Sequence, residues 1–237
     1  MVRMPTYDRS ATLSSTRDAE LLSGFLRGVY GWMCGGLAIT AGTAWVVANS
    51  PSISTAIFTN RLLFWAIIIA QFGIVITLSA RVNRLAASTA AALFVAYSAL
   101  TGVTLSFVLL LYTGESVAST FVVAGGMFGG LALYGTVTRR NLSGFGQFMF
   151  MGLIGLVLAT VVGMFWHNDG LQFMISLVGV FVFAGLTVYD AQRLKSLALA
   201  TEAGSMSATT IVGALALYLD FINLFLSLLR FLGDRRR

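Results

Sequence analysis

One acidic residue, Asp220, stands in the middle of a long apolar stretch near the carboxyl end of the chain, ALYLDFINLFLSLLRF. An aspartate at the centre of a membrane helix costs about 2.5–3.5 kcal/mol on insertion scales, so a chain that keeps one there is expected to use it. Three polar residues follow it at steps of three, four and three, and therefore share one helical face with it: Asn223, Ser227 and Arg230. We expect this face to meet protein or water rather than lipid.

A second acidic residue, Asp190, ends an earlier apolar run, in the segment GLTVYDAQRLK. Ser176 and Thr187 lie on the same side of that predicted helix, so this helix also has a polar face. One interpretation is structural, with Asp190 as an acid at the membrane interface that pairs with Arg193. Asp220 also has a structural interpretation, a hydrogen-bonded clasp between helices.

If the helices that carry the two aspartates are adjacent and antiparallel, the two side chains can act together as one site. Both carboxylates would then lie in the inner half of the membrane. Two carboxylates within hydrogen-bond distance at low dielectric do not both ionise cheaply, so one holds a proton and the pair titrates as a unit. Such a pair can sense protons or supply hard oxygen ligands to Ca²⁺. Arg81, at the inner end of the second apolar run, is placed to provide a counter-charge that switches with protonation.

The composition determines the class of protein. The chain has 237 residues, of which 57% are hydrophobic and 10% charged, whereas soluble domains carry about 25% charged residues. We predict an all-α integral membrane protein, because a helix satisfies its own backbone hydrogen bonds where water is absent. The net charge of +6 is attributed to arginines that flank the membrane, so nucleic acid is not expected as a partner. One cysteine and one histidine make a metal or catalytic cluster of these residues hard to build, and no resident cofactor is expected.

Seven apolar runs predict a bundle of seven transmembrane helices in the lipid bilayer, joined by short connections. The predicted transmembrane domain covers 28–233, between a polar amino-terminal tail, 1–27, and a short basic tail, 234–237. We expect the first tail to be disordered or to lie on the membrane surface. The predicted spans are 29–48, 62–80, 88–111, 117–137, 145–166, 171–189 and 208–232.

The distribution of basic residues predicts a cytoplasmic amino terminus. In that orientation the inner segments carry ten arginines and lysines, against one, Arg61, in the first three outer loops. The basic residues at the end of the chain break this pattern, because seven full crossings place them outside. Either this tail is an exception to the rule, which we favour, or the last segment enters the membrane and returns.

Pairs of small residues four positions apart predict faces where helix backbones approach closely. We interpret these pairs as architecture rather than as binding sites. They are Gly31/Gly35, Gly125/Gly129, Gly126/Gly130 and Ser98/Gly102.

The run LYLDFINLFLSLLRFLG, the segment VYDAQRLK, the stretch AYSALTGVTLS and the seven-span plan together resemble the Bax inhibitor, or transmembrane Bax-inhibitor-motif, family. The similarity extends over about residues 27–233. For bacterial relatives it implies a seven-helix bundle of the inner membrane with a central last helix. It also implies a pH-sensitive calcium leak whose sensor is an aspartate pair, here Asp190 and Asp220. An arginine latch on the second helix would be Arg81, with Arg84 as the competitor.

Three functional hypotheses follow. The first is a proton-gated Ca²⁺ pathway, in which protons and Ca²⁺ compete for the same carboxylate oxygens. Some relatives carry an acid within the second helix, where this chain has Gln71, so an ion path there would differ. The alternative is a regulatory membrane protein that modulates a membrane protease or a stress response through partners that bind the amino-terminal tail. An intramembrane aspartyl protease is the enzymatic rival, but an acid at the interface suits it poorly, and we expect no enzyme activity.

Overall fold

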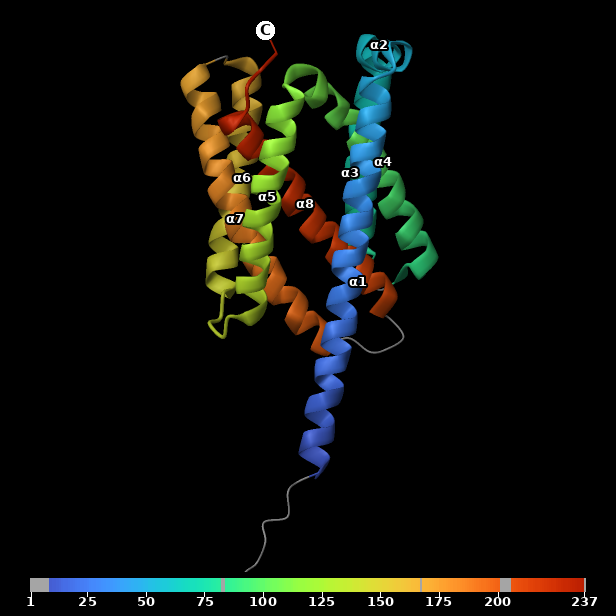
Figure 1. Cartoon of the computed structure of the whole chain (residues 1–237), viewed down its shortest axis with the longest axis vertical. Helices are drawn as coiled ribbons and strands as arrows, with labels where there is room; N and C mark the ends of the chain where they lie inside the picture. The colour runs from blue at the N-terminus through green and yellow to red at the C-terminus, as the bar shows by residue number, and fades with distance from the viewer. Residues whose placement is uncertain (1–8, 82–83, 167, 201–205, 237) are drawn as a thin grey trace, which may run out of the picture.

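The protein is a bundle of α-helices (Figure 1). The computed structural model describes residues 9–81, 84–166, 168–200 and 206–236. Seven of the helices in this part of the chain, all but the short α2, are long and apolar enough to cross a membrane, which confirms the predicted fold class. The helices are α1 (Arg9–Ala48), α2 (Pro51–Thr59), α3 (Arg61–Ala80), α4 (Ala87–Leu111), α5 (Gly114–Val137), α6 (Ser143–Phe165), α7 (Asp169–Ala200) and α8 (Met206–Leu232).

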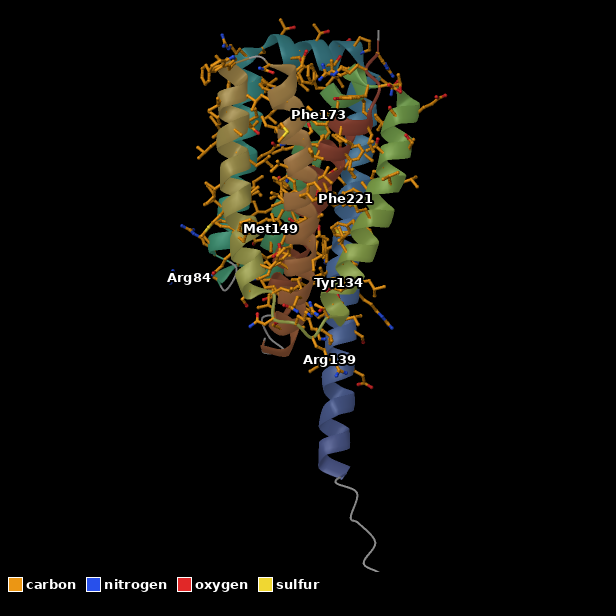
Figure 2. The ribbon with its side chains drawn as sticks, turned by 90° about the vertical axis from the view of Figure 1, so that its left-hand side faces the viewer. Arg84, Tyr134, Arg139, Met149, Phe173 and Phe221 are labelled. Carbon is orange, nitrogen blue, oxygen red and sulfur yellow. The ribbon has the colours of Figure 1, made fainter. Side chains whose placement is uncertain are left out.

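Helix α1 begins well before the predicted first span. Residues 9–27 of the predicted tail are not disordered but continue the helix, and its apolar part begins at Glu20. Residues 9–23 contain neither proline nor glycine, so no residue type interrupts the helix before the membrane. The amino-terminal part of α1 projects from the rest of the bundle (Figure 1, Figure 2). Residues 1–8 of the predicted tail lie outside the described residues.

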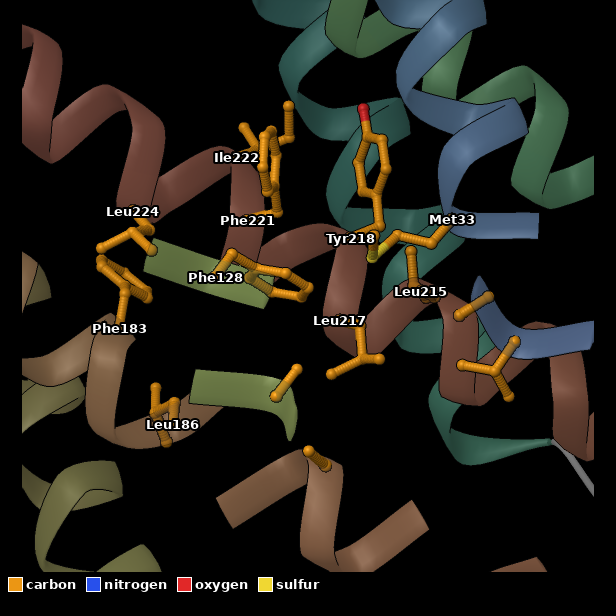
Figure 3. Packing of buried hydrophobic residues seen from close by; sticks show 14 of the residues in the cluster. Met33, Phe128, Phe183, Leu186, Leu215, Leu217, Tyr218, Phe221, Ile222 and Leu224 are labelled. Carbon is orange, nitrogen blue, oxygen red and sulfur yellow. The ribbon is translucent and has the colours of Figure 1, made fainter. Parts of the chain in front are cut away.

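Helix α8 forms the centre of the bundle, as the family resemblance implies. It packs against α1, α4, α5 and α7, and it has the largest buried share of the seven spans. Figure 3 shows its side chains, among them Leu217 and Tyr218, pointing towards helices on different sides of it. Both of these side chains are fully buried. An acidic residue on this helix is therefore shielded from lipid.

A buried polar contact joins α8 to two of its neighbours. The hydroxyl groups of Thr40 on α1 and Tyr218 on α8 lie 2.6 Å apart, and the Thr40 hydroxyl donates to the Ser98 carbonyl on α4 at 2.9 Å. The Tyr218 ring also meets Phe94 and Tyr97 of α4 edge to face. Since polar groups at this depth are costly when unpaired, these contacts fix the rotation of α8 relative to α1 and α4.

The carboxy-terminal tail lies at the end of the bundle opposite the start of α1 (Figure 1). The last helix is continuous, so the final segment crosses the bundle and does not turn back. Backbone N–H groups of Thr113 and Arg236 donate to the carbonyls of Asp234 and Leu111, at 3.1 and 2.8 Å, and the Asp234 N–H donates to Ser116 Oγ at 2.8 Å. These bonds hold the tail against the connection between α4 and α5.

The four small-residue pairs differ in whether they lie close against another helix. A Cβ added at Gly102 would lie 2.6 Å from the Thr40 carbonyl oxygen, so the pair of Ser98 and Gly102 is a close contact of α4 on α1. The other three pairs do not pack against helices within the described chain. A Cβ at any of their glycines would meet no atom within 4 Å: Gly31, Gly35, Gly125, Gly126, Gly129 and Gly130.

We expect Gly102→Ala to destabilise the bundle by about 1–3 kcal/mol, because the new methyl group overlaps the backbone of α1. Gly129→Ala is the matched control, since the same change in another membrane helix meets open space. It should change stability by no more than about 1 kcal/mol. Thermal unfolding of the purified protein in detergent measures both, and equal melting temperatures for the two variants would contradict the packing described here.

Candidate ion and proton site

Asp220 is buried in the middle of α8, with 6% of its surface exposed. Its Oδ2 atom has no hydrogen-bond partner among the described residues. Oδ2 therefore forms no clasp with the described residues, and the clasp interpretation of Asp220 stays a prediction. A buried carboxylate oxygen without a donor is unfavourable until a proton, a cation or water meets it. Asp220 is therefore the chemical centre of the candidate site.

Asp190 lies within α7 rather than at its end. The sequence predicted that the sixth span stops at residue 189, whereas α7 continues to Ala200. The reason is that Ala191, Leu194 and Ala198 recur at helical spacing and are buried against the rest of the bundle, despite the polar residues between them. Asp190 is consequently held by a rigid helix on both sides and is half-buried.

The two aspartates lie on adjacent helices. Helices α7 and α8 pack along one another, and Asp190 lies near enough to Asp220 for their charges to interact. Arg193, one turn further along α7, acts in turn on Asp190, so the predicted interaction of these two residues coexists with the aspartate pair. Like charges in a medium of low dielectric repel strongly, and a proton or a cation between them relieves that repulsion.

The polar face of α8 lies along a cavity of about 470 Å³ between α3, α4, α6, α7 and α8. Asn223, Ser227 and Arg230 all line it, and so does Leu219, the residue next to Asp220. The cavity therefore extends from the carboxyl end of α8 to the helical turn that carries the buried acid. The Asn223 amide and the Ser227 hydroxyl each donate to a carbonyl of α8 itself, both at 2.8 Å, which leaves the Asn223 side-chain oxygen as an acceptor beside the cavity.

The two latch candidates lie apart from the pair. Arg81 directly follows α3, Arg84 lies three residues later, and both are exposed. Figure 2 shows Arg84 at the edge of the bundle. Within the described residues, neither side chain forms a hydrogen bond or an ion pair with Asp190 or Asp220. Helix α3 packs against α2 and α4. A latch contact would therefore require the end of α3 to move, and the assignment stays a prediction.

Two side chains near Asp190 have roles that the sequence reasoning missed. Leu142 N–H donates to Gln192 Oε1 at 3.0 Å, and Gln192 Nε2 donates to the Arg140 carbonyl at 2.7 Å. Lys195 Nζ donates to the Thr136 carbonyl at 3.1 Å. The Gln192 bonds attach the connection between α5 and α6 to α7, and the Lys195 bond attaches the end of α5 to it. The signal was present, because both side chains are long polar groups that closely follow the acid in VYDAQRLK.

Comparison with known proteins identifies the family. The family model described as "Inhibitor of apoptosis-promoting Bax1" matches residues 22–237. The chain belongs to the Bax inhibitor family. Among its relatives, Inner membrane protein YbhL of Escherichia coli K12 is 47% identical over 98% of this chain and 100% of that protein. Uncharacterized proteins of Borreliella burgdorferi and Deinococcus radiodurans are 44% and 43% identical, over 90% and 94% of this chain and 92% and 96% of theirs.

The family, the inner membrane relative and the seven apolar helices together make this Bax inhibitor family member a multi-pass bacterial inner membrane protein. The resemblance noted in the sequence is thereby confirmed for family and fold.

We expect Gln192→Ala to loosen the connection between α5 and α6, because it removes both side-chain bonds to that backbone. Amide hydrogen exchange at Leu142 should become about tenfold faster, the effect of losing roughly one net hydrogen bond. Ser196→Ala is the control, since it removes a hydroxyl that is bonded only within α7. Unchanged exchange at Leu142 in the Gln192 variant would show that these bonds do not hold the connection.

Proposed function

We propose that this Bax inhibitor family protein is a pH-sensitive calcium leak pathway gated by the Asp190–Asp220 pair. One observation carries the proposal: the adjacent helices α7 and α8 place Asp190 near enough to Asp220 for their charges to interact, and Asp220 is buried with an oxygen that has no described partner. In a medium of low dielectric, such a pair is more stable with a bound proton or divalent cation than with both carboxylates ionised and unneutralised. The pair can therefore report pH and hold a passing ion with the same oxygens.

The chemistry of the pair suits passage of Ca²⁺ better than its storage. Ca²⁺ takes about six to eight oxygen ligands. The described residues contain no group of three or more His, Cys, Asp or Glu that could hold a metal ion. Two carboxylates would thus supply only part of the coordination shell, and water and backbone carbonyls would supply the rest. An ion held in this way leaves readily, as conduction requires.

The cavity beside α8 offers a route towards the pair from the end of the bundle that holds the carboxy terminus, although neither aspartate lines it. It reaches Leu219 and passes Asn223 and Ser227, whose polar groups can accompany a hydrated ion. With the amino terminus cytoplasmic, as the arginine distribution predicts, this side is the outer one. Gln71 lines the cavity in the helix where some relatives carry an acid, so this chain offers an amide rather than a charge there.

Protonation is expected to act in two ways. Each proton that binds removes a negative charge and weakens Ca²⁺ binding, because both ligands use the same oxygens. It also removes the attraction that would draw Arg81 or Arg84 towards the pair, and so shifts the balance between latched and unlatched arrangements.

We expect Asp220→Asn to lower Ca²⁺ flux in liposomes by about tenfold, since it removes a charged ligand of the ion. It should also flatten the dependence of flux on pH, because the remaining acid no longer has a like-charged partner. Asp190→Asn should do the same if the two residues act as a pair. Asp169→Asn, a change to an exposed acid in the first turn of α7, is the control. Wild-type flux and pH response in the Asp220 variant would refute the proposal.

A second candidate function is regulation of a membrane protease or a stress response through partner proteins. It is favoured by the part of α1 that projects from the bundle (Figure 1), which offers a partner a helical surface outside the membrane.

Deletion of residues 1–19 separates the two candidates, because it leaves the apolar span from Glu20 intact. If the leak is the function, flux and its pH response should stay at wild-type values in liposomes. A loss of flux in the truncated protein would place the projecting helix in the pathway itself. A cellular stress phenotype that disappears while flux persists would favour the regulatory role.

A further inference from the structure

The cavity beside α8 contains a charge that a calcium pathway does not need. Arg230, in the last turn of α8, is the one residue with a full charge among the described residues that line the cavity, and none of them is an acid. In the described chain no carboxylate forms an ion pair with this guanidinium, although the Tyr112 ring lies close to it. A guanidinium within a membrane span is unfavourable without an anionic partner. The chain itself leaves this position open to an external anion.

Most of the remaining lining is apolar and lies at membrane depth, with Gln71, Tyr97, Thr160, Asn223 and Ser227 as the polar members. Helix α3 packs on α4 and helix α6 on α7, and the cavity lies between these two pairs of helices. Phe72 and Val75 of α3 face it from one side, and Leu153 and Val157 of α6 from the other. A volume of 470 Å³ is in the usual range for small-molecule pockets, about 300–1,000 Å³. The cavity is thus a space with a cationic end, mostly apolar walls on α3 and α6, and a polar strip on α8.

We propose that this cavity binds a membrane lipid with a net-negative headgroup, its phosphate at Arg230 and an acyl chain between α3 and α6. The guanidinium offers a planar fork of donors that matches a phosphate group in a bidentate manner. Arg230 lies in the last turn of α8, where headgroups are found, and it is exposed to an incoming group. The apolar walls extend from there towards the middle of the bilayer, as an acyl chain does.

Arg230 also has a simpler role, which the experiment must separate from lipid binding. A cation in the last turn of a helix interacts favourably with the helix dipole, and a long side chain there can reach any headgroup around the protein. Such surface contact involves no occupant between α3 and α6. The two accounts therefore differ in whether the apolar half of the cavity matters.

Lipid binding to the full chain in detergent, followed by native mass spectrometry, tests the proposal. We expect one tightly retained phosphatidylglycerol, and retention of phosphatidylcholine at least about tenfold weaker. Arg230→Gln should weaken phosphatidylglycerol binding by about tenfold, with Arg230→Lys intermediate. Arg139→Gln changes an exposed arginine at the opposite end of the bundle and is the control. Unchanged binding in Arg230→Gln would overturn the site.

Val157→Trp fills the apolar half of the cavity without changing any charge. It should abolish phosphatidylglycerol retention while the melting temperature stays near wild type, and Val161→Phe replaces it if that variant fails to fold. Retention at the wild-type level would mean surface contact only and would overturn the proposal.

Competition of inorganic phosphate and of glycerol phosphate with the bound lipid is the last experiment. Displacement of the lipid by either one at equal concentration would assign the site to a free anion instead. These experiments measure lipid binding and not ion flux. A negative result would therefore leave the calcium proposal intact, and a refutation of the calcium proposal would leave the lipid site intact.

Discussion

The cost of holding one acidic side chain, Asp220, at membrane depth is the constraint on which the rest of this bundle depends. Asp220 cannot face lipid, so the helix that carries it must be covered by other helices on nearly every side. That requirement explains why the last helix of the chain occupies the centre, against α1, α4, α5 and α7. It also explains the polar contact of Tyr218 with Thr40, two residues from the acid, which fixes the direction in which Asp220 points.

Helix α8 carries two opposite charges on one face. Asp220 lies in its middle and Arg230 ten residues later, a separation of about 15 Å along the axis. The cavity of α8 connects the two levels. A bare guanidinium at the mouth of this cavity would repel an approaching Ca²⁺, whereas one neutralised by an anionic lipid would not. The two proposals are thus compatible, and the lipid would set the electrostatic barrier at the entrance to the pair.

Sequence reasoning succeeded where one strong physical cost decides the outcome. The apolar runs predicted the seven spans, and the cost of an intramembrane acid drew attention to Asp220, which is buried. Its pairing with Asp190 stays a prediction. The sequence reasoning failed where the physical effects that favour and oppose a local structure are close in size. The polar segment before residue 27 was expected to be disordered or to lie on the membrane surface, whereas α1 starts at Arg9, since residues 9–23 contain neither proline nor glycine. The end of α7 was placed too early because polar residues hide the apolar spacing of Ala191, Leu194 and Ala198. Three of the four small-residue pairs did not predict their neighbours, since a glycine permits close packing without requiring it.

The central claim is that protons and Ca²⁺ bind to the same pair of carboxylates. Calorimetric titration of the purified protein with Ca²⁺, repeated at one pH in buffers with different heats of ionisation, measures the protons that binding displaces. The account predicts net proton release on Ca²⁺ binding by the wild-type chain, and no release in Asp220→Asn. Calcium binding to the wild type without proton release, or equal release from the variant, would contradict it.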